Sequence, residues 1–181
     1  MKRIVITYGL IAGTIVAAMM LITMPLFKNG TLNHEDGELY GYSTMVIALS
    51  MVFFGVKTFR DKHSNGTITF GQGLTVGLLI TLIAAVMYST AWEISLVTED
   101  MGDYMTTWIQ QQYDEMKATG ATEAELQEWK AKWDKFLGYY DIMPIRFVIT
   151  MVEILPVGII ISLISAALLR KKEFLPSTEG A

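Results

Sequence analysis

Residues 70–97 read FGQGLTVGLLITLIAAVMYSTAWEISLV, and the single charged residue in this stretch is Glu93. A bilayer core of about 30 Å is crossed by roughly 20 helical residues, because each backbone N–H and C=O must find its partner inside the segment. The stretch is long and apolar enough to do this. It therefore predicts a membrane-spanning α-helix.

Three further apolar stretches have the same character. They cover residues 4–27, 42–59 and 142–169. The first follows two basic residues, but its apolar run exceeds the ~7 to 15 residues of a signal-peptide core, so we expect a retained span. Together the four stretches predict an all-α integral membrane four-helix bundle, with residues 1–181 forming a single membrane domain.

Composition agrees with a membrane protein and excludes several classes of site. Of the 181 residues, 52% are hydrophobic and 18% are charged, which is too apolar for an ordinary soluble domain. The absence of cysteine excludes disulfides and thiolate chemistry. No phosphate-binding glycine motif occurs, and His34 and His63 are expected on opposite sides of the membrane. We therefore expect no catalytic residues, no metal, no cofactor and no nucleic-acid partner.

The distribution of basic residues predicts the orientation, because Lys and Arg near span ends tend to remain cytoplasmic. One side has Lys2, Arg3, Lys57, Arg60, Lys62, Arg170, Lys171 and Lys172. On the other side, the lysines of the long connection are outnumbered by acidic residues. We expect both termini to be cytoplasmic, and the basic cluster at residues 57–63 to act mainly in fixing this topology, with headgroup contact secondary.

The connection at residues 98–141 is predicted to form an extracytoplasmic amphipathic helical hairpin. Apolar residues recur there at spacings of three and four, on both sides of Gly120. Thr122 and Glu125 match the capping box that begins a helix. The candidate stripe for a partner or a membrane interface contains Trp108, Trp129, Trp133 and Tyr140.

Four uses of this aromatic stripe remain open. The stripe can pack within the hairpin and against the span ends, cover the mouth of the bundle, lie in the headgroup layer, or dock on an envelope protein or a second copy of the chain. The acidic face of the hairpin argues against an anionic lipid surface.

Two charged residues are expected near the outer boundary of the third and fourth spans. Glu93 and Arg146 fall at similar depths when about 1.5 Å of rise per residue is counted in opposite directions. Charges at such positions usually have a partner. We therefore expect an ion pair that joins the two spans.

Glu153 lies near the middle of the fourth span, just before Pro156. A carboxyl group at this depth is costly, and it can be neutral and donate a hydrogen bond. Thr14, Ser50 and Thr81 are expected at similar depth, which predicts a central polar cluster. Glu153 either binds a proton, cation or polar substrate, or forms a structural interhelical hydrogen bond of about 0.6 to 2 kcal/mol.

Small residues recur four positions apart on three of the spans. The sets are Gly9 with Gly13, Gly73 with Gly77, and Gly158 with Ser162 and Ala166. Such spacing allows helix backbones to approach closely in lipid. The sequence leaves open whether these faces meet within one chain or between chains.

Several motifs resemble a known family. The run FFGVKTFRDK at 53–62, TFGQG at 69–73, GLL at 77–79 and the start of the first span at residues 2–10 are similar to the bacterial family catalogued as domain of unknown function 4199. The family often has Tyr where this chain has Phe59. The resemblance implies four spans and a bacterial inner-membrane location, and it implies no chemistry.

Two functions from different classes follow from these features. The first is a non-enzymatic envelope interaction or scaffold protein that uses the hairpin. The alternative is a small transporter or channel subunit that uses Glu153, and a third, an intramembrane enzyme, lacks a convergent catalytic set. A Glu153 sealed in a dry helix contact would argue against the transporter.

Overall fold

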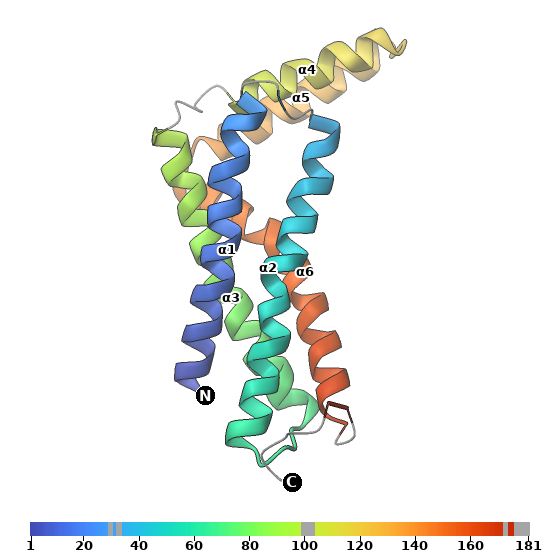
Figure 1. Ribbon diagram of the computed structural model, residues 1–181. Helices are drawn as coiled ribbons and strands as arrows, with labels where there is room; N and C mark the ends of the chain where they lie inside the picture. The colour runs from blue at the N-terminus through green and yellow to red at the C-terminus, as the bar shows by residue number, and fades with distance from the viewer. Residues whose placement is uncertain (29–30, 32–33, 99–103, 172–173, 176–181) are drawn as a thin grey trace. The chain divides into compact units, whose positions relative to one another are not determined.

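The computed structural model describes residues 1–28, 31, 34–98, 104–171 and 174–175. Within these residues all regular secondary structure is helical, and no strand is present. The six helices are α1 (Lys2–Lys28), α2 (His34–His63), α3 (Phe70–Thr98), α4 (Tyr104–Ala118), α5 (Glu123–Tyr140) and α6 (Met143–Leu169). The prediction of an all-α chain is confirmed (Figure 1).

Four of these helices are long and apolar enough to cross a membrane. The qualifying segments are Lys2–Leu26, Leu39–His63, Phe70–Thr98 and Met143–Leu169. The second differs most from its predicted bounds of 42–59, because the helix continues through polar residues at both ends. Backbone hydrogen bonds do not stop where apolar side chains stop, so hydropathy alone underestimates such a helix.

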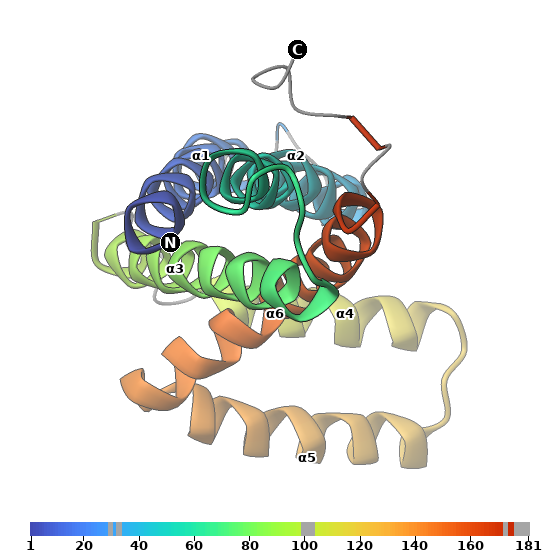
Figure 2. The same cartoon turned by 90° about the horizontal axis from the view of Figure 1, so that it is seen from below.

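The helices contribute to two compact units. The first consists of Met1–Trp92 and Thr150–Ala181, and the second of Glu93–Ile149. In the first unit α1 packs along α2. The start of α1, the end of α2, the start of α3 and the end of α6 lie at one end of this unit (Figures 1 and 2).

Small residues bring α3 and α6 together inside the first unit. A Cβ added at Gly77 would lie 2.7 Å from Ser162 Oγ, and one added at Gly158 would overlap Thr81 Cγ2. Gly73 lies in the same way against Ala166. The small-residue faces of α3 and α6 therefore meet within one chain.

The small residues of α1 also face α3. A Cβ added at Gly9 would lie 2.7 Å from Ile83 Cβ, and one added at Gly13 would lie 2.9 Å from Met87 Cβ. α3 is thus approached closely by two helices, which explains why half of its apolar window is buried.

The second unit contains α4 and α5, whose ends follow local sequence signals. Gly120 follows the end of α4 with φ of 92°, a left-handed conformation that favours glycine. Thr122 then caps α5: its Oγ accepts from the Glu125 N–H at 3.3 Å, and the Glu125 carboxylate accepts from the Thr122 N–H at 2.8 Å. The predicted stop and capping box are confirmed.

Candidate functional site

Glu153 is an exposed carboxyl group on α6, in the middle of an apolar helix. The hydroxyl of Tyr88, a buried residue of α3, donates to its Oε2 across 3.4 Å. This hydrogen bond is long, so it constrains the carboxylate weakly. A carboxylate has about four acceptor sites, and in the described part of the chain Tyr88 uses one of those on Glu153.

The other members of the predicted polar cluster make different contacts. Thr81 and Ser162 place their hydroxyl oxygens 3.5 Å apart. The Ser50 hydroxyl donates to the Ile47 carbonyl of its own helix at 2.6 Å, and Thr14 is exposed. The predicted cluster is corrected accordingly: among the described contacts, Glu153 pairs with Tyr88, because equal depth does not place residues on facing sides of their helices.

Tyr88 was missed by the sequence reasoning, although a signal existed. A tyrosine within a span buries its ring and requires a partner for its hydroxyl. On α6, the carboxyl of Glu153 is such a partner. Counting hydroxyl groups in tyrosines together with those in serines and threonines would have identified this pair.

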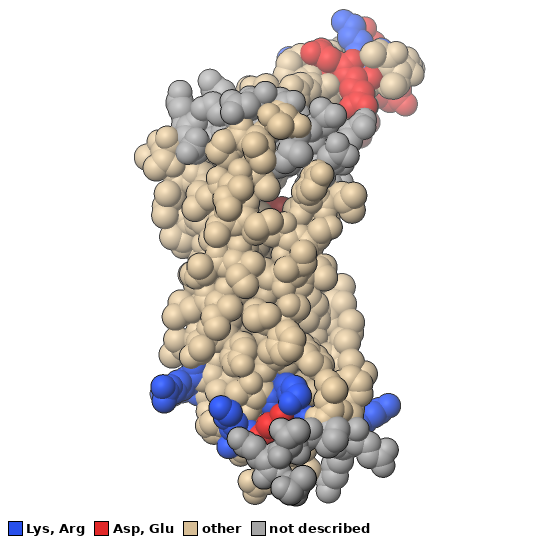
Figure 3. Space-filling view, viewed as in Figure 1, with Lys and Arg blue, Asp and Glu red and all other residues tan. Residues whose placement is uncertain are grey.

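The space-filling view adds the surroundings of the first unit. Figure 3 shows a hollow between α1 and α2, with acidic side-chain atoms at its bottom and uncharged residues along both helices. Lys and Arg gather at the end of the unit where α1 begins and α2 ends. Apart from these features, the described residues visible on this face of α1 and α2 are uncharged.

Glu93 and Arg146 form a forked ion pair in the second unit. Arg146 Nη2 lies 2.7 Å from Glu93 Oε2 and Nε lies 2.9 Å from Oε1. Arg146 Nη1 also donates to the Tyr140 carbonyl at 3.0 Å, and its guanidinium lies 5.6 Å from the centre of the Tyr140 ring. The pair therefore joins the ends of α3 and α5 to the start of α6.

The aromatic stripe packs between α4 and α5. The Trp108 and Trp133 ring centres are 5.2 Å apart in an edge-on contact, and Trp129 lies 5.6 Å from Trp133. Phe136 continues the series to Tyr140, which is buried. The three tryptophans are half-buried, so packing within the helix pair uses much of the stripe.

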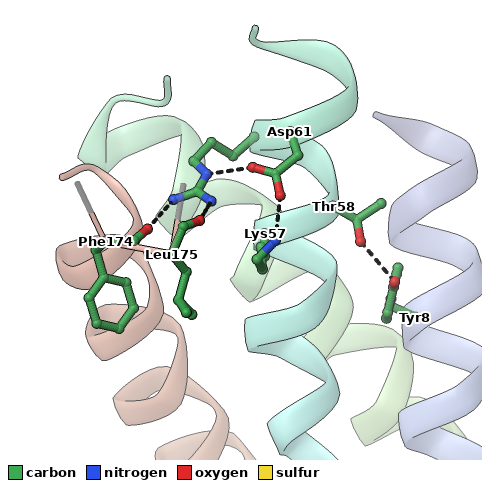
Figure 4. Close-up of polar contacts among 7 residues, drawn as sticks. Tyr8, Lys57, Thr58, Asp61, Phe174 and Leu175 are labelled. Atoms are coloured by element: carbon green, nitrogen blue, oxygen red, sulfur yellow. Dashed lines mark hydrogen bonds and ion pairs between the residues drawn. The ribbon is translucent and has the colours of Figure 1, made fainter. Parts of the chain in front are cut away.

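Arg60 is not the exposed surface charge that its predicted role in membrane topology implies. Its side chain is completely buried, and Nη1 and Nη2 donate to the carbonyl oxygens of Phe174 and Leu175 (Figure 4). Asp61 accepts from Arg60 Nε at 2.7 Å and from Lys57 Nζ at 2.6 Å. Repeated basic residues at a span end resemble a topology signal, and this masked the polar network.

The opposite side of α2 makes a separate contact with α1. The Tyr8 hydroxyl lies 2.8 Å from Thr58 Oγ1. Among the described residues, no group of three or more His, Asp or Glu side chains could hold a metal ion. The candidate site of the first unit is therefore the exposed carboxyl of Glu153 with Tyr88.

Comparison with known proteins agrees with the family resemblance. The model of the family described as "Protein of unknown function (DUF4199)" matches residues 7–171, which is most of the chain. No curated protein and no solved structure matches it. The chain therefore belongs to the DUF4199 family of proteins of unknown function.

Proposed function

We propose that this protein is a multi-pass bacterial inner-membrane protein that binds a proton or a small cation at Glu153, as a small transporter or channel subunit does. The observation on which this rests is the exposure of a carboxyl group halfway along an apolar helix. A charged group that faces lipid at this depth costs about 2.5 to 3.5 kcal/mol on insertion scales. Contact with water or a cation removes much of this cost.

The neighbours of Glu153 support a binding role over a purely structural one. A carboxyl that fixed helix register would be enclosed by α3 and α6, as Thr81 and Ser162 are. Glu153 is instead exposed and receives one long hydrogen bond from Tyr88. In the proposed role, a proton or cation reaches this carboxyl without the helices separating.

The topology is part of the same proposal. By the preference of basic residues for the cytoplasmic side, we propose that both termini are cytoplasmic and that the connection between the third and fourth spans is extracytoplasmic. In this proposal Glu153, near the middle of α6, lies within the bilayer.

Glu153→Gln tests the binding role, because it retains hydrogen bonding and removes titration. Infrared difference spectra of the reconstituted protein, recorded across a pH change, should contain a carboxylic-acid band that the variant lacks. Proteoliposomes with an internal pH dye should show proton or cation flux that the variant abolishes. Ser50→Ala is the matched control, because its hydroxyl is satisfied within α2. Equal flux in Glu153→Gln and the parent protein would eliminate this function.

An envelope interaction through α4 and α5 is the second candidate. It is favoured by the outer faces of the two helices, which are exposed and charged, as at Asp114, Glu115, Lys130 and Lys132. Because the tryptophans contact one another, a partner would meet the charged faces.

Cross-linking in native membranes tests this second candidate. The intact protein should capture one defined envelope component, and Lys130→Glu with Lys132→Glu should reduce that capture severalfold. The control is Gly138→Ala, at an exposed site in α5 where an added Cβ meets no described atom within 4 Å. If charge reversal does not change the amount captured, the charged face does not bind the partner.

A further inference from the structure

The end of α2 contains a guanidinium group that is fully shielded from solvent. Arg60 Nη1 lies 2.8 Å from the Phe174 oxygen and Nη2 lies 2.5 Å from the Leu175 oxygen. The third contact, from Nε, goes to Asp61. Two neighbouring oxygens therefore face the forked end of the guanidinium (Figure 4).

The charges at this contact do not balance. Lys57 and Arg60 share the single carboxylate of Asp61, whose two oxygens they divide. The carbonyls supply dipoles and no net negative charge, so the described side chains at this contact have one positive charge in excess. A phosphate group offers oxygens in a similar fork together with the missing negative charge, and Arg recognises phosphate in this bidentate way.

The segment that now occupies the guanidinium adopts an unfavourable backbone conformation. Leu175 has φ of 48°, in the left-handed region that non-glycine residues rarely adopt. The Phe174 ring makes an edge-on contact with Phe53, with ring centres 6.4 Å apart. Among the described residues, the turn is held by the two Arg60 hydrogen bonds, by a 3.1 Å hydrogen bond from the Phe174 N–H to the Lys171 carbonyl, and by this ring contact. The unfavourable conformation of Leu175 offsets part of this stabilisation, so a ligand that competes for Arg60 can displace the Leu175 carbonyl.

We propose that Arg60 is a phosphate-binding site which the chain's own Phe174–Leu175 turn occupies in this structure. A phosphate group, from an anionic lipid headgroup or free in solution, displaces the turn and takes its place on the guanidinium. Lys62, Arg170 and Lys171 are exposed and attract anions to this end of the unit. The site is distinct from Glu153, and its test does not depend on the proposed transport.

The test follows the mobility of the turn. The chain has no cysteine, so Leu175→Cys gives a single site for a nitroxide spin label while keeping the backbone carbonyl. The full-length protein is measured in maltoside micelles, which contain no phosphate, and then with inorganic phosphate or with phosphatidylglycerol. Sodium chloride at matched ionic strength is the salt control.

The label should be immobile in maltoside alone and become mobile when phosphate is supplied. If only phosphatidylglycerol mobilises the label, the ligand is a lipid headgroup. If inorganic phosphate mobilises it as well, the site also binds free phosphate. Arg60→Gln should give a mobile label from the start, with no further response. Lys135→Gln, at an exposed lysine of α5, should behave as the parent protein.

Two results would overturn the proposal. One is a label in the parent protein that responds equally to phosphate sources and to chloride, or to none of them. The other is a label in Arg60→Gln as immobile as in the parent. If Arg60→Gln does not fold, Arg60→Lys tests the same point, because an ammonium group keeps the positive charge but cannot donate to both carbonyls as the guanidinium does. It should loosen the turn, and an unchanged turn would count against the proposal.

Discussion

Gly158→Ala should destabilise the contact between α3 and α6. The added Cβ would overlap Thr81 Cγ2 and lie 2.8 Å from Thr81 Oγ1 and 3.0 Å from Thr81 Cβ. Rotation of the Thr81 side chain relieves the first two contacts, but its Cβ moves only with the backbone. Overpacking of this kind costs about 1 to 3 kcal/mol, and we expect about 2 kcal/mol because one contact cannot be relieved by rotation.

The assay is equilibrium unfolding in mixed micelles of maltoside and dodecyl sulfate, followed by circular dichroism. Thr81→Ala alone should cost only ~0.6 kcal/mol, since its hydrogen bond to Ser162 is long. The double variant should recover part of the loss, leaving the Cβ contact. Gly71→Ala is the control, because its Cβ would meet no described atom within 4 Å. A Gly158→Ala protein as stable as the parent, or no recovery in the double variant, would refute this account of the packing.

Three further outcomes are expected in the second unit. Glu93→Gln should lower the free energy of unfolding by about 2 kcal/mol, because it removes the carboxylate that forms the forked ion pair with the half-buried Arg146 guanidinium. Urea unfolding of the reconstituted protein measures this, and no change would show that other groups or solvent replace the pair. Trp133→Ala should lower the free energy of unfolding by about 3 kcal/mol, because it removes contacts with three aromatic rings. Helical circular dichroism should then be lost at a lower temperature on heating, and an unchanged melting curve would contradict the packing. The pKa of Glu125 lies below its ordinary value because its carboxylate accepts hydrogen bonds from the backbone N–H of Thr122 and from the Thr122 hydroxyl. The stability that this cap gives to α5 is therefore present above the unfolded-state pKa of Glu125 and is lost as the pH falls through the folded-state pKa. The protection of amides in the first turn of α5, measured relative to their intrinsic exchange rates, should therefore fall in acid, and Glu125→Gln should remove that dependence.

The fold of the spans could be predicted from the sequence because lipid imposes one strong requirement. Every backbone polar group must be paired inside the helix, so four apolar stretches specify four long helices. The capping box at Thr122 was equally readable, since it depends on residues three positions apart. Both predictions use information local to one helix.

The polar contacts between helices were harder to predict because they depend on helix rotation. Depth along the bilayer placed Thr14, Ser50 and Thr81 near Glu153, but depth does not determine the facing side. The Glu93–Arg146 pair was accessible because opposite charges at one depth have few alternatives. Arg60 was not, because its partners are main-chain carbonyls at Phe174 and Leu175, which have no sequence signature.

The small-residue contact between α3 and α6 also has a consequence for biosynthesis. During translation α3 leaves the ribosome long before α6, and the whole of α4 and α5 is made in between. Throughout that interval Gly73 and Gly77 of α3 lack the helix that later covers them. We expect a nascent chain stalled at this stage to be held by a membrane insertase or chaperone, and a chain ending before α6 to be removed by membrane quality-control proteases.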